Sequence, residues 1–257
     1  MKILLTGSSK GIGYRIAQDL IKEGHQIVLH YNSNKLPLDK LKTKSSSDLF
    51  IVKADLSSED EVKNLVEETI KKIGLPDSVI NNAGIAESAD ITLDFNNWSS
   101  MFDKTIDVNL KAPSLIFKEI IKYKRSNKIK SRLRFINIAS RAAFRGEQQD
   151  YISYACSKGG IISLTKTMSR SFGDSDNVVA ISIAPGFVRT EMAQSFIDKH
   201  GEDSVKQGIT LDRLTEPKDI SPIVSLIVSG KMDHSTGSTI DVNGGSFLRY
   251  IKHQKNY

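Results

Sequence analysis

The chain of 257 residues is 39% hydrophobic and 26% charged, with 36 basic residues, 30 acidic residues and a formal net charge of +6. This composition is typical of a globular domain and argues against a disordered, collagen-like or coiled-coil chain. The single cysteine, Cys156, excludes an internal disulfide, and no apolar run approaches the roughly 18 residues that a membrane span needs. We therefore expect one cytoplasmic domain over residues 1–257, without a signal peptide or a membrane anchor.

Short apolar runs alternate with helical patterns along the whole chain. The apolar runs predict strands over residues 2–6, 26–30, 49–53, 78–81, 133–139, 178–184 and 238–242. Amphipathic spacing predicts helices over residues 12–23, 58–73, 103–124 and 152–171, and a further helix that opens at residues 215–217. Ser58 and Glu61 have the spacing of a capping box, and residues 34–47 are expected to form a weak helix and a loop. The alternation predicts an α/β fold in which helices cover both faces of a parallel sheet.

A glycine-rich loop, Thr6-Gly7-Ser8-Ser9-Lys10-Gly11-Ile12-Gly13, follows the first strand and opens a helix. Glycines here let the backbone turn tightly and approach a pyrophosphate, whose charge then lies at the helix N-terminus. The spacing is not that of the commonest dinucleotide fingerprint, and no Gly-Lys-Ser/Thr follows as in a P-loop. We interpret the loop as a dinucleotide site; the alternative is a helix-entry loop that binds nothing.

The second predicted strand is followed by a stretch without acids, since no carboxylate occurs between Gly24 and Leu38. NAD-preferring sites usually carry an acidic residue in this region for the ribose 2′-hydroxyl. The side chains near this position are polar or cationic: Ser9, Lys10, Asn32, Ser33 and Lys35. An ammonium attracts a 2′-phosphate that a carboxylate would repel. We therefore predict a preference for NADP(H), with NAD(H) as the alternative cofactor and a solvated surface lysine as the alternative for Lys10.

Ser140 lies at the end of the fifth predicted strand, and Tyr154 and Lys158 open the helix that follows. An ammonium about 4 Å from a phenol is worth about 4 kcal/mol at an effective dielectric of about 20, or about three pKa units. We therefore expect Lys158 to bring the pKa of the Tyr154 phenol toward neutrality, so that it exchanges a proton with a carbonyl or alcohol oxygen that Ser140 also hydrogen-bonds. Tyr31 and Lys35 share the spacing but lack the preceding serine, and the alternative for Tyr154 alone is a core or interface tyrosine.

Five motifs occur in the order typical of one family: Thr6-Gly7-x-x-x-Gly11-x-Gly13, Asn81-Asn82-Ala83-Gly84, Asp107-Val108-Asn109-Leu110, Ser140 with Tyr154 and Lys158, and Pro185-Gly186 followed by Thr190. With these motifs almost the whole chain resembles the short-chain dehydrogenase/reductase family. The resemblance implies a single Rossmann-type domain with a doubly wound parallel sheet of about seven strands. It also implies an enzyme whose catalytic residues are Asn109, Ser140, Tyr154 and Lys158.

The resemblance further implies a role for each position. In this family the tyrosine is the acid/base, the serine orients the substrate, the lysine also holds the nicotinamide ribose, and the asparagine supports a water path to the lysine. The cofactor-binding residues would be Gly7, Ser9, Lys10, Gly11, Ile12 and Gly13 in the loop, Tyr31, Asn32 and Ser33 after the second strand, Asp55 and Leu56 by the adenine, Asn82, Ala83 and Gly84 along the adenosine, and Tyr154, Lys158, Pro185, Gly186, Val188 and Thr190 at the nicotinamide end. No metal site is expected, because His25, His30, His200, His234 and His253 lack ligand spacing.

Within the family, the chain is most similar to the 3-oxoacyl-[acyl-carrier-protein] reductase group, through Arg213-Leu214 before Pro217 and through Asp241-Val242-Asn243-Gly244-Gly245. This implies reduction of a ketone on a carrier-bound acyl chain in fatty acid biosynthesis, and a homotetramer built on helices 103–124 and 152–171. Two features depart from the group: a short segment between the second and third strands, and a basic run in place of the usual glycine before the fifth. The alternatives are an enzyme for a small ketone, sugar or steroid-like alcohol, and a nucleotide-sensing or nucleic-acid-binding protein without catalysis.

Three further features carry expectations of their own. The basic run of seven residues from Lys122 to Arg134 is interpreted as a solvated helix end and loop, with a nucleic-acid footprint as the alternative. Cys156 is expected to be a small packed residue. Residues 187–214 mix charges with the apolar side chains of Phe187, Met192, Phe196, Ile197 and Ile209. This segment is predicted to be a substrate lid, with a surface helical excursion as the alternative.

Overall fold

The computed structural model describes residues 1–43, 48–206, 209–211 and 213–248. Within them, seven strands form one parallel sheet in the order β3-β2-β1-β4-β5-β6-β7. The strands are β1 (Lys2–Leu5), β2 (Gln26–Tyr31), β3 (Leu49–Lys53), β4 (Ser78–Asn81), β5 (Leu133–Ile138), β6 (Val178–Pro185) and β7 (Thr239–Val242). The order runs outward from β1 and β4 in opposite directions, which confirms the predicted doubly wound fold. In such sheets a ligand crevice opens at this reversal, beyond the carboxyl ends of the strands.

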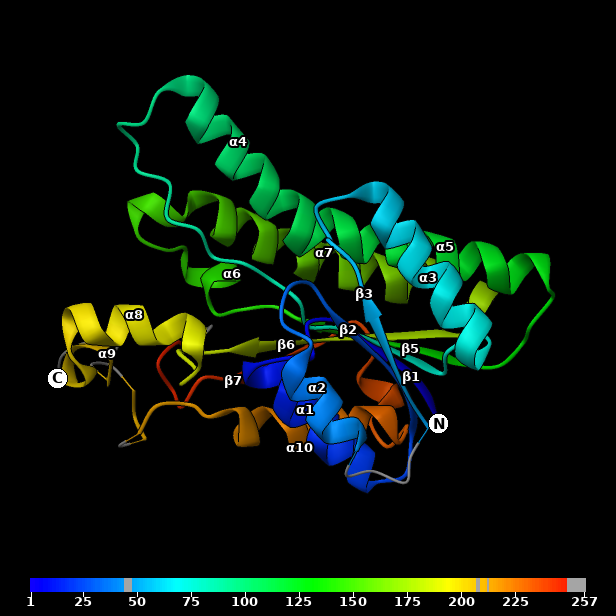
Figure 1. Cartoon of the computed structure of the whole chain (residues 1–257). Coiled ribbons are helices and arrows are strands. Elements are labelled where there is room, and N and C mark those ends of the chain that lie inside the picture. The colour runs from blue at the N-terminus through cyan, green and yellow to red at the C-terminus, as the bar shows by residue number, and fades with distance from the viewer. Residues whose placement is uncertain (44–47, 207–208, 212, 249–257) are drawn as a thin grey trace, which may run out of the picture.

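Helices cover the sheet on both faces, as Figure 1 shows. One layer contains α1 (Gly11–Lys22), α2 (Leu36–Lys42) and α10 (Pro217–Val228), and the other contains α3 (Glu59–Ile73), α5 (Ala112–Ser126) and α7 (Ile152–Asp176). Side chains along β1 alternate between the two cores: Ile3 and Leu5 pack with α1 and α10, whereas Leu4 packs with α3 and α5. The parallel direction of all seven strands places their carboxyl ends at one edge, where loops and helix starts gather. No helix of the described residues is long and apolar enough to cross a membrane.

The helix predicted over residues 103–124 begins earlier than expected. Its first part is α4 (Phe95–Ile106), capped by the Asp94 carboxylate, which accepts a hydrogen bond from the Asn97 backbone N–H at 3.1 Å. A π-helical turn over Asp107–Lys111 then leads directly into α5. The start was missed because the first turns of α4 bury little, and Phe95 is 83% exposed, so no apolar period marks them.

Other boundaries follow local chemistry. α7 continues five residues beyond the predicted end, to Asp176, and stops at Asn177, whose φ of 53° is left-handed. α2 confirms the weak helix of the 34–47 segment, of which residues 44–47 lie outside the described part. The short helices α6 (Ala142–Arg145), α8 (Glu191–His200) and α9 (Glu202–Lys206) and the 3-10 turns Gln149–Tyr151 and Asp233–Ser235 were not predicted as elements.

The capping box at the start of α3 is only half formed. The Ser58 hydroxyl accepts from the Glu61 backbone N–H at 3.4 Å, as expected. The Glu61 carboxylate, however, accepts from the Asp55 backbone N–H at 2.7 Å instead of reaching back to Ser58. It therefore holds the turn after β3. α10 does begin at Pro217 as predicted.

The basic run covers the end of α5, the loop after it and the start of β5, and five of its seven residues are exposed, in agreement with a solvated helix end and loop. Lys124 and Arg134 are the exceptions, and several members also make specific folded contacts. Arg125 makes a bidentate pair with Asp176, with both N···O distances at 2.7 Å. The buried Lys124 ammonium donates to the carbonyls of Ile129 and Ser131 at 2.7 and 2.5 Å. The charges of Arg125 and Lys124 are thus balanced by an acid and by backbone carbonyls that the local sequence does not reveal.

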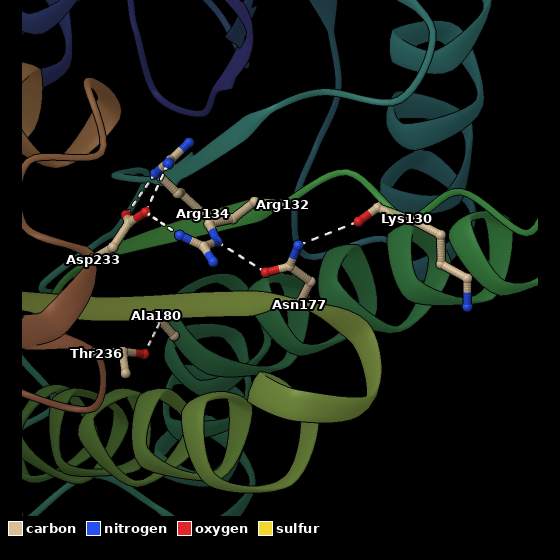
Figure 2. Close-up of polar contacts among 7 residues, drawn as sticks. All are labelled: Lys130, Arg132, Arg134, Asn177, Ala180, Asp233 and Thr236. Carbon is tan, nitrogen blue, oxygen red and sulfur yellow. Dashed lines mark hydrogen bonds and ion pairs between the residues drawn. The ribbon is translucent and has the colours of Figure 1, made fainter.

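The second half of the run joins β5 to the turn before β7 (Figure 2). Arg134 holds Asp233 through two hydrogen bonds of 2.7 and 2.8 Å, and Arg132 adds a third at 2.7 Å. Asn177 accepts from Arg132 at 2.9 Å and donates to the Lys130 carbonyl at 3.2 Å, whereas the Lys130 ammonium lies apart from the network. This cluster lies at the amino ends of β5 and β6, the sheet edge opposite the crevice.

Candidate active site

The loop between β1 and α1 is built so that only glycine fits at two positions. A Cβ on Gly7, whose φ is +64°, would lie 2.7 Å from the Ala83 Cα, and a Cβ on Gly13 would lie 2.1 Å from the Gly7 carbonyl oxygen. The first turn of α1 contains no acid, and its N-cap, Lys10, makes no side-chain capping hydrogen bond. The N–H groups of this turn can therefore face an anion, which fits the pyrophosphate of a dinucleotide.

A buried histidine holds this loop, and sequence reasoning missed it. The Gly7 N–H donates to His30 Nδ1 at 3.0 Å, and His30 Nε2 lies 2.9 Å from the Ala54 carbonyl oxygen. These partners assign a neutral ring with its proton on Nε2. Burial lowers the pKa of His30, in agreement with that state. The sequence signal was a histidine inside an apolar strand, which was considered only as a metal ligand.

The end of β4 is fastened to the same loop. Asn82 Nδ2 donates to the carbonyls of Thr6 and Gly7 at 3.0 and 2.9 Å. The Thr6 hydroxyl accepts from the N–H groups of Asn82 and Ala83 at 3.0 and 3.1 Å. The motif Asn82-Ala83-Gly84 thus runs from the glycine loop toward Asn109 and Lys158.

The predicted adenosine end is more open. Asn32, Ser33 and Lys10 are exposed, and Tyr31 is half-buried. Lys35 lies 3.3 Å from the Asp39 carboxylate, so an acid just beyond the acid-free stretch takes part of its charge. Lys10 forms no ion pair with the described residues.

Beside β3, the predicted adenine contacts are well fixed. The Asp55 carboxylate accepts from the Ser57 N–H and hydroxyl at 2.9 and 2.7 Å, and these hydrogen bonds lower its pKa. Leu56 is buried against the α3 layer.

Ser140, Tyr154 and Lys158 come together at the carboxyl end of β5. The Lys158 ammonium donates to the Ile138 carbonyl at 2.9 Å and lies 5.6 Å from the centroid of the Tyr154 ring. The Ser140 hydroxyl lies near enough to the phenol to lower its pKa, and it accepts from the Ala142 N–H at 3.1 Å. The spacing of four residues on α7 therefore does place the phenol and the ammonium on one face.

The electrostatic expectation for this pair was wrong. Burial raises the pKa of Tyr154, and this outweighs the Ser140 hydrogen bond and the Arg141 guanidinium, which lower it. Burial also lowers the pKa of Lys158 to about 8. The expectation counted the attraction between the charges but not the cost of removing a phenolate from water. Near neutral pH the phenol keeps its proton and is poised as a donor.

Asn109 stands in the π-helical turn between α4 and α5 and is 1% exposed. Its amide donates to the Ile85 carbonyl at 2.8 Å and to the Ser157 hydroxyl at 3.0 Å, and its oxygen accepts from the Ile85 N–H at 2.8 Å. The same oxygen and the Lys158 ammonium both lie close to Gly84, where a Cβ would stand 3.2 and 3.4 Å from them. Asn109 therefore positions the loop after β4 beside Lys158 and does not itself line the cleft.

One cleft of about 690 Å³ joins the cofactor end to the catalytic end. Its lining includes the predicted residues Ile12, Asn82, Gly84, Ser140, Tyr154, Lys158, Pro185, Gly186, Val188 and Thr190. Gly7, Ser9, Lys10, Gly11, Gly13, Tyr31, Asn32, Ser33, Asp55, Leu56 and Ala83 lie outside this lining. On the substrate side, Arg141, Arg145 and Glu147 also face the cleft, and sequence reasoning did not single them out.

The segment predicted as a lid forms α8 and α9 beside the carboxyl end of β6 (Figure 1). Ile197, Val205 and Leu214 bury a small apolar cluster of their own, and Arg189 pairs with Glu202 at 2.6 Å. Ala193 and Val205 line the cleft, so the segment does border it. Residues 207, 208 and 212 and the side chains of Met192 and Phe196 lie outside the described part. The lid remains a prediction.

Two other expectations concern single residue types. Cys156 is exposed, which corrects the expectation of a packed residue: one turn of α7 turns Ser157 and Lys158 inward and Cys156 outward. Among the described residues, no group of three histidine, cysteine, aspartate or glutamate side chains is placed to hold a metal ion.

The fold and the site together define a dinucleotide-binding α/β protein with serine, tyrosine and lysine in one cleft. A family model described as "Enoyl-(Acyl carrier protein) reductase" matches residues 7–246. The 3-oxoacyl-[acyl-carrier-protein] reductase FabG of Staphylococcus epidermidis is 31% identical over 249 residues, which are 95% of this chain and 98% of that protein. The FabG of Rickettsia conorii is 32% identical over 245 residues, which are 95% and 96%. The chain therefore belongs to the short-chain dehydrogenase/reductase family.

Solved structures agree with this assignment. A 4-hydroxyisoleucine dehydrogenase complexed with NADH matches with a TM-score of 0.84 and 31% identity over 95% of this chain and 97% of that one. An actinorhodin polyketide ketoreductase with NADPH, 22% identical over 95% of this chain and 96% of that one, has a TM-score of 0.85 and shares the fold. The class of activity is thus oxidoreductase.

Proposed function

We propose that this chain is an NADP(H)-dependent reductase that interconverts a ketone and a secondary alcohol. The observation that carries the proposal is the single cleft in which the α1 N-terminus, Ser140, Tyr154 and Lys158 meet. A nicotinamide cofactor, when bound, supplies the hydride. Tyr154 donates the proton to the carbonyl oxygen, because burial keeps the phenol protonated. Ser140 holds the same oxygen, and the Lys158 ammonium provides positive charge beside it.

The chain's own residues fit this cofactor. Ile12 and Gly13 would face the pyrophosphate, and Lys158 and Thr190 would hold the nicotinamide end, as in the family. The preference for the 2′-phosphate rests on Lys10 and on the acid-free stretch after β2. Equal kcat/KM values for NADPH and NADH would remove this preference and leave the reductase proposal intact.

For the substrate, the FabG relatives support a 3-oxoacyl chain on an acyl carrier protein. A second candidate is a small ketone. It is favoured by the arginine side chains of the cleft and by the likeness to 4-hydroxyisoleucine dehydrogenase. A binding protein without catalysis is disfavoured, because such a protein needs no serine and tyrosine beside a buried lysine in one cleft.

The proposal is tested by NADPH oxidation with acetoacetyl thioesters and small ketones, with Tyr154→Phe as the diagnostic variant. The variant is expected to lose at least about a hundredfold in kcat while it keeps its affinity for NADPH, since only the proton donor is gone. Full turnover by Tyr154→Phe, or no turnover by the wild-type chain with any ketone, would overturn the proposal.

A further inference from the structure

Arg141 is a half-buried guanidinium in the substrate side of the cleft. It directly follows Ser140, and its charge acts on the Tyr154 phenol. One of its N–H groups donates to the Ser246 hydroxyl at 2.6 Å. No carboxylate of the described residues lies within 4.0 Å of it. A guanidinium carries five N–H donors, so most of its hydrogen-bonding capacity faces the cleft unused.

This state is unusual within the molecule. Each of the other described arginines either pairs with a carboxylate or is exposed: Arg15, Arg125, Arg132, Arg134, Arg145, Arg189 and Arg213 pair, and Arg170 is exposed. A partly buried charge without an opposite charge beside it is costly, and burial accordingly lowers the pKa of Arg141. Such a charge beside catalytic groups suits an anion that arrives with the substrate.

Apart from Lys158, which acts on the reacting oxygen, the charges around Arg141 can accommodate one anion. Arg145 also faces the cleft, but it is paired with Glu147 at 2.8 Å, so its charge is already balanced. Arg141, Arg145 and Glu147 together carry one net positive charge. One carboxylate would neutralise it and satisfy the free face of the guanidinium through two parallel hydrogen bonds.

We infer that Arg141 binds a carboxylate carried by the substrate itself, which favours the second of the two candidate substrates, in the form of a small keto acid or hydroxy acid. This inference rests on the proposed reductase function. Because Arg141 lines the same cleft as Ser140 and its charge acts on the Tyr154 phenol, an anion bound there would lie near the reacting carbonyl. The phosphate of a carrier arm lies the full length of the pantetheine away from that carbonyl, so it does not meet this requirement.

The first test compares two ketones that differ in the charge and by one methyl group: acetoacetate and methyl acetoacetate. With NADPH, the wild-type chain is expected to favour acetoacetate by about tenfold or more in kcat/KM, because charge-assisted hydrogen bonds contribute that much. Arg141→Met is expected to bring the ratio close to one, mainly through the KM for acetoacetate. Arg141→Lys keeps the charge but loses the fork and should fall between the two.

Arg170→Met is the matched control, because it removes an unpaired arginine outside the cleft. It is expected to keep the wild-type ratio within about twofold. Melting temperatures and NADPH affinities of all variants show whether they fold. Ser246→Ala removes the hydrogen-bond partner of Arg141 without touching the charge, and it should retain a clear preference for acetoacetate.

A second test does not depend on turnover. Calorimetric titration of the cofactor-loaded protein with malonate, a dicarboxylate that cannot be reduced, should show binding that weakens at least about tenfold in Arg141→Met. A comparison of acetoacetyl-pantetheine with its 4′-phosphate distinguishes the two sources of an anion. A gain from the phosphate that disappears in Arg141→Met would overturn the carboxylate assignment.

The outcomes separate this inference from the proposed function. If the wild-type chain reduces the ester and the acid equally well, or if malonate binds equally to Arg141→Met, the carboxylate site is overturned and the reductase stands. If no ketone is reduced with NADPH, the proposed function fails, and the malonate titration alone decides whether Arg141 binds a carboxylate.

Discussion

Lys158 is a residue whose contribution to activity opposes its contribution to stability. Burial lowers its pKa to about 8, so the folded chain pays a desolvation penalty whenever this lysine is charged. We predict that Lys158→Met abolishes turnover yet raises the free energy of unfolding by about 1–2 kcal/mol at pH 7.

The stability that Lys158→Met gains over the wild-type chain is expected to decrease as the pH rises. Because the folded pKa lies below the ordinary value of 10.5, the unfolded chain binds more protons between about pH 8 and 10.5. The wild-type chain therefore recovers stability as the pH rises through this window, and its difference from Lys158→Met should shrink. Urea unfolding of the wild-type chain and Lys158→Met at pH 7 and pH 9.5 measures this difference in unfolding free energy. If Lys158→Met is less stable than the wild-type chain at pH 7, the hydrogen bond from Lys158 to the Ile138 carbonyl contributes more than the burial of the charge costs.

The protonation state of His30 makes the structure of the glycine loop dependent on pH. Its pKa is lowered by burial, so it contributes stability above the unfolded value of 6.5, and that contribution is lost as the pH falls below it. Protonation of Nδ1 also removes the acceptor for the Gly7 N–H. We predict that NADPH affinity and unfolding free energy both fall between pH 7 and pH 5.

His30→Gln is the matching variant, because an amide can accept from Gly7 and donate to Ala54 without titrating. It should flatten both pH profiles. Profiles that remain as steep as those of the wild-type chain would assign the effect to another group.

At the scale of elements, the role of the turn between β1 and α1 can be tested by comparing a glycine substitution in this turn with one inside α7. Gly13→Ala would place a methyl 2.1 Å from the Gly7 carbonyl oxygen, so the loop must shift away from the cofactor. NADPH affinity should fall at least about tenfold, with a stability cost of about 1–3 kcal/mol. Gly173→Ala, in the interior of α7 with only an ordinary contact at 3.7 Å, is the control and should be neutral or stabilising. NADPH affinity is measured by fluorescence titration. Equal affinities for Gly13→Ala and Gly173→Ala would contradict the assignment of this loop as the cofactor site.

The contact of β5 with the turn before β7 predicts a change in stability without a change in activity. Asp233→Ala leaves Arg132 and Arg134 without their shared carboxylate, at the sheet edge opposite the cleft. We expect a loss of about 1–3 kcal/mol in urea unfolding, since a part-buried pair loses one partner. The kcat/KM should stay within about twofold; a larger change would mean that this edge and the cleft are coupled.

The sequence predicted those elements that depend only on residues close together in the chain. The glycine loop, the Tyr154–Lys158 spacing and the β-strands follow from period and backbone requirements that neighbouring residues reveal. Partners distant in the chain could not be predicted in this way: Asp176 pairs with Arg125, and Asp233 pairs with Arg132 and Arg134. Nor could the local sequence show that burial rather than charge dominates the pKa of the Tyr154 phenol. Arg141 was missed because it belongs to none of the five motifs, and only the cleft shows its importance.

For the whole molecule, we predict a homotetramer assembled through the faces of α4, α5 and α7. Phe95 at 83% exposure and Ile91 at 57% leave apolar area on and beside α4 that no described segment covers. Surfaces of this kind are typical of subunit contacts. Light scattering coupled to size-exclusion chromatography should give about four times the chain mass of 28.5 kDa. A monomer at micromolar concentration would contradict it, and Phe95→Lys should shift the distribution toward smaller species.

The π-helical turn at Asp107–Lys111 has a consequence for how this chain tolerates changes in length. Such a turn amounts to one surplus residue in an α-helix, and α-helical backbones are the more stable alternative. Deleting Leu110 would relieve that surplus and regularise the backbone, but it would also change the direction of the side chains within the turn, Asn109 among them. Asn109 could not then keep both Ile85 and Ser157 as partners. Removing a residue from a helix usually lowers its stability. Here we expect the continuous helix of α4 and α5 to fold well, whereas the enzyme loses its activity.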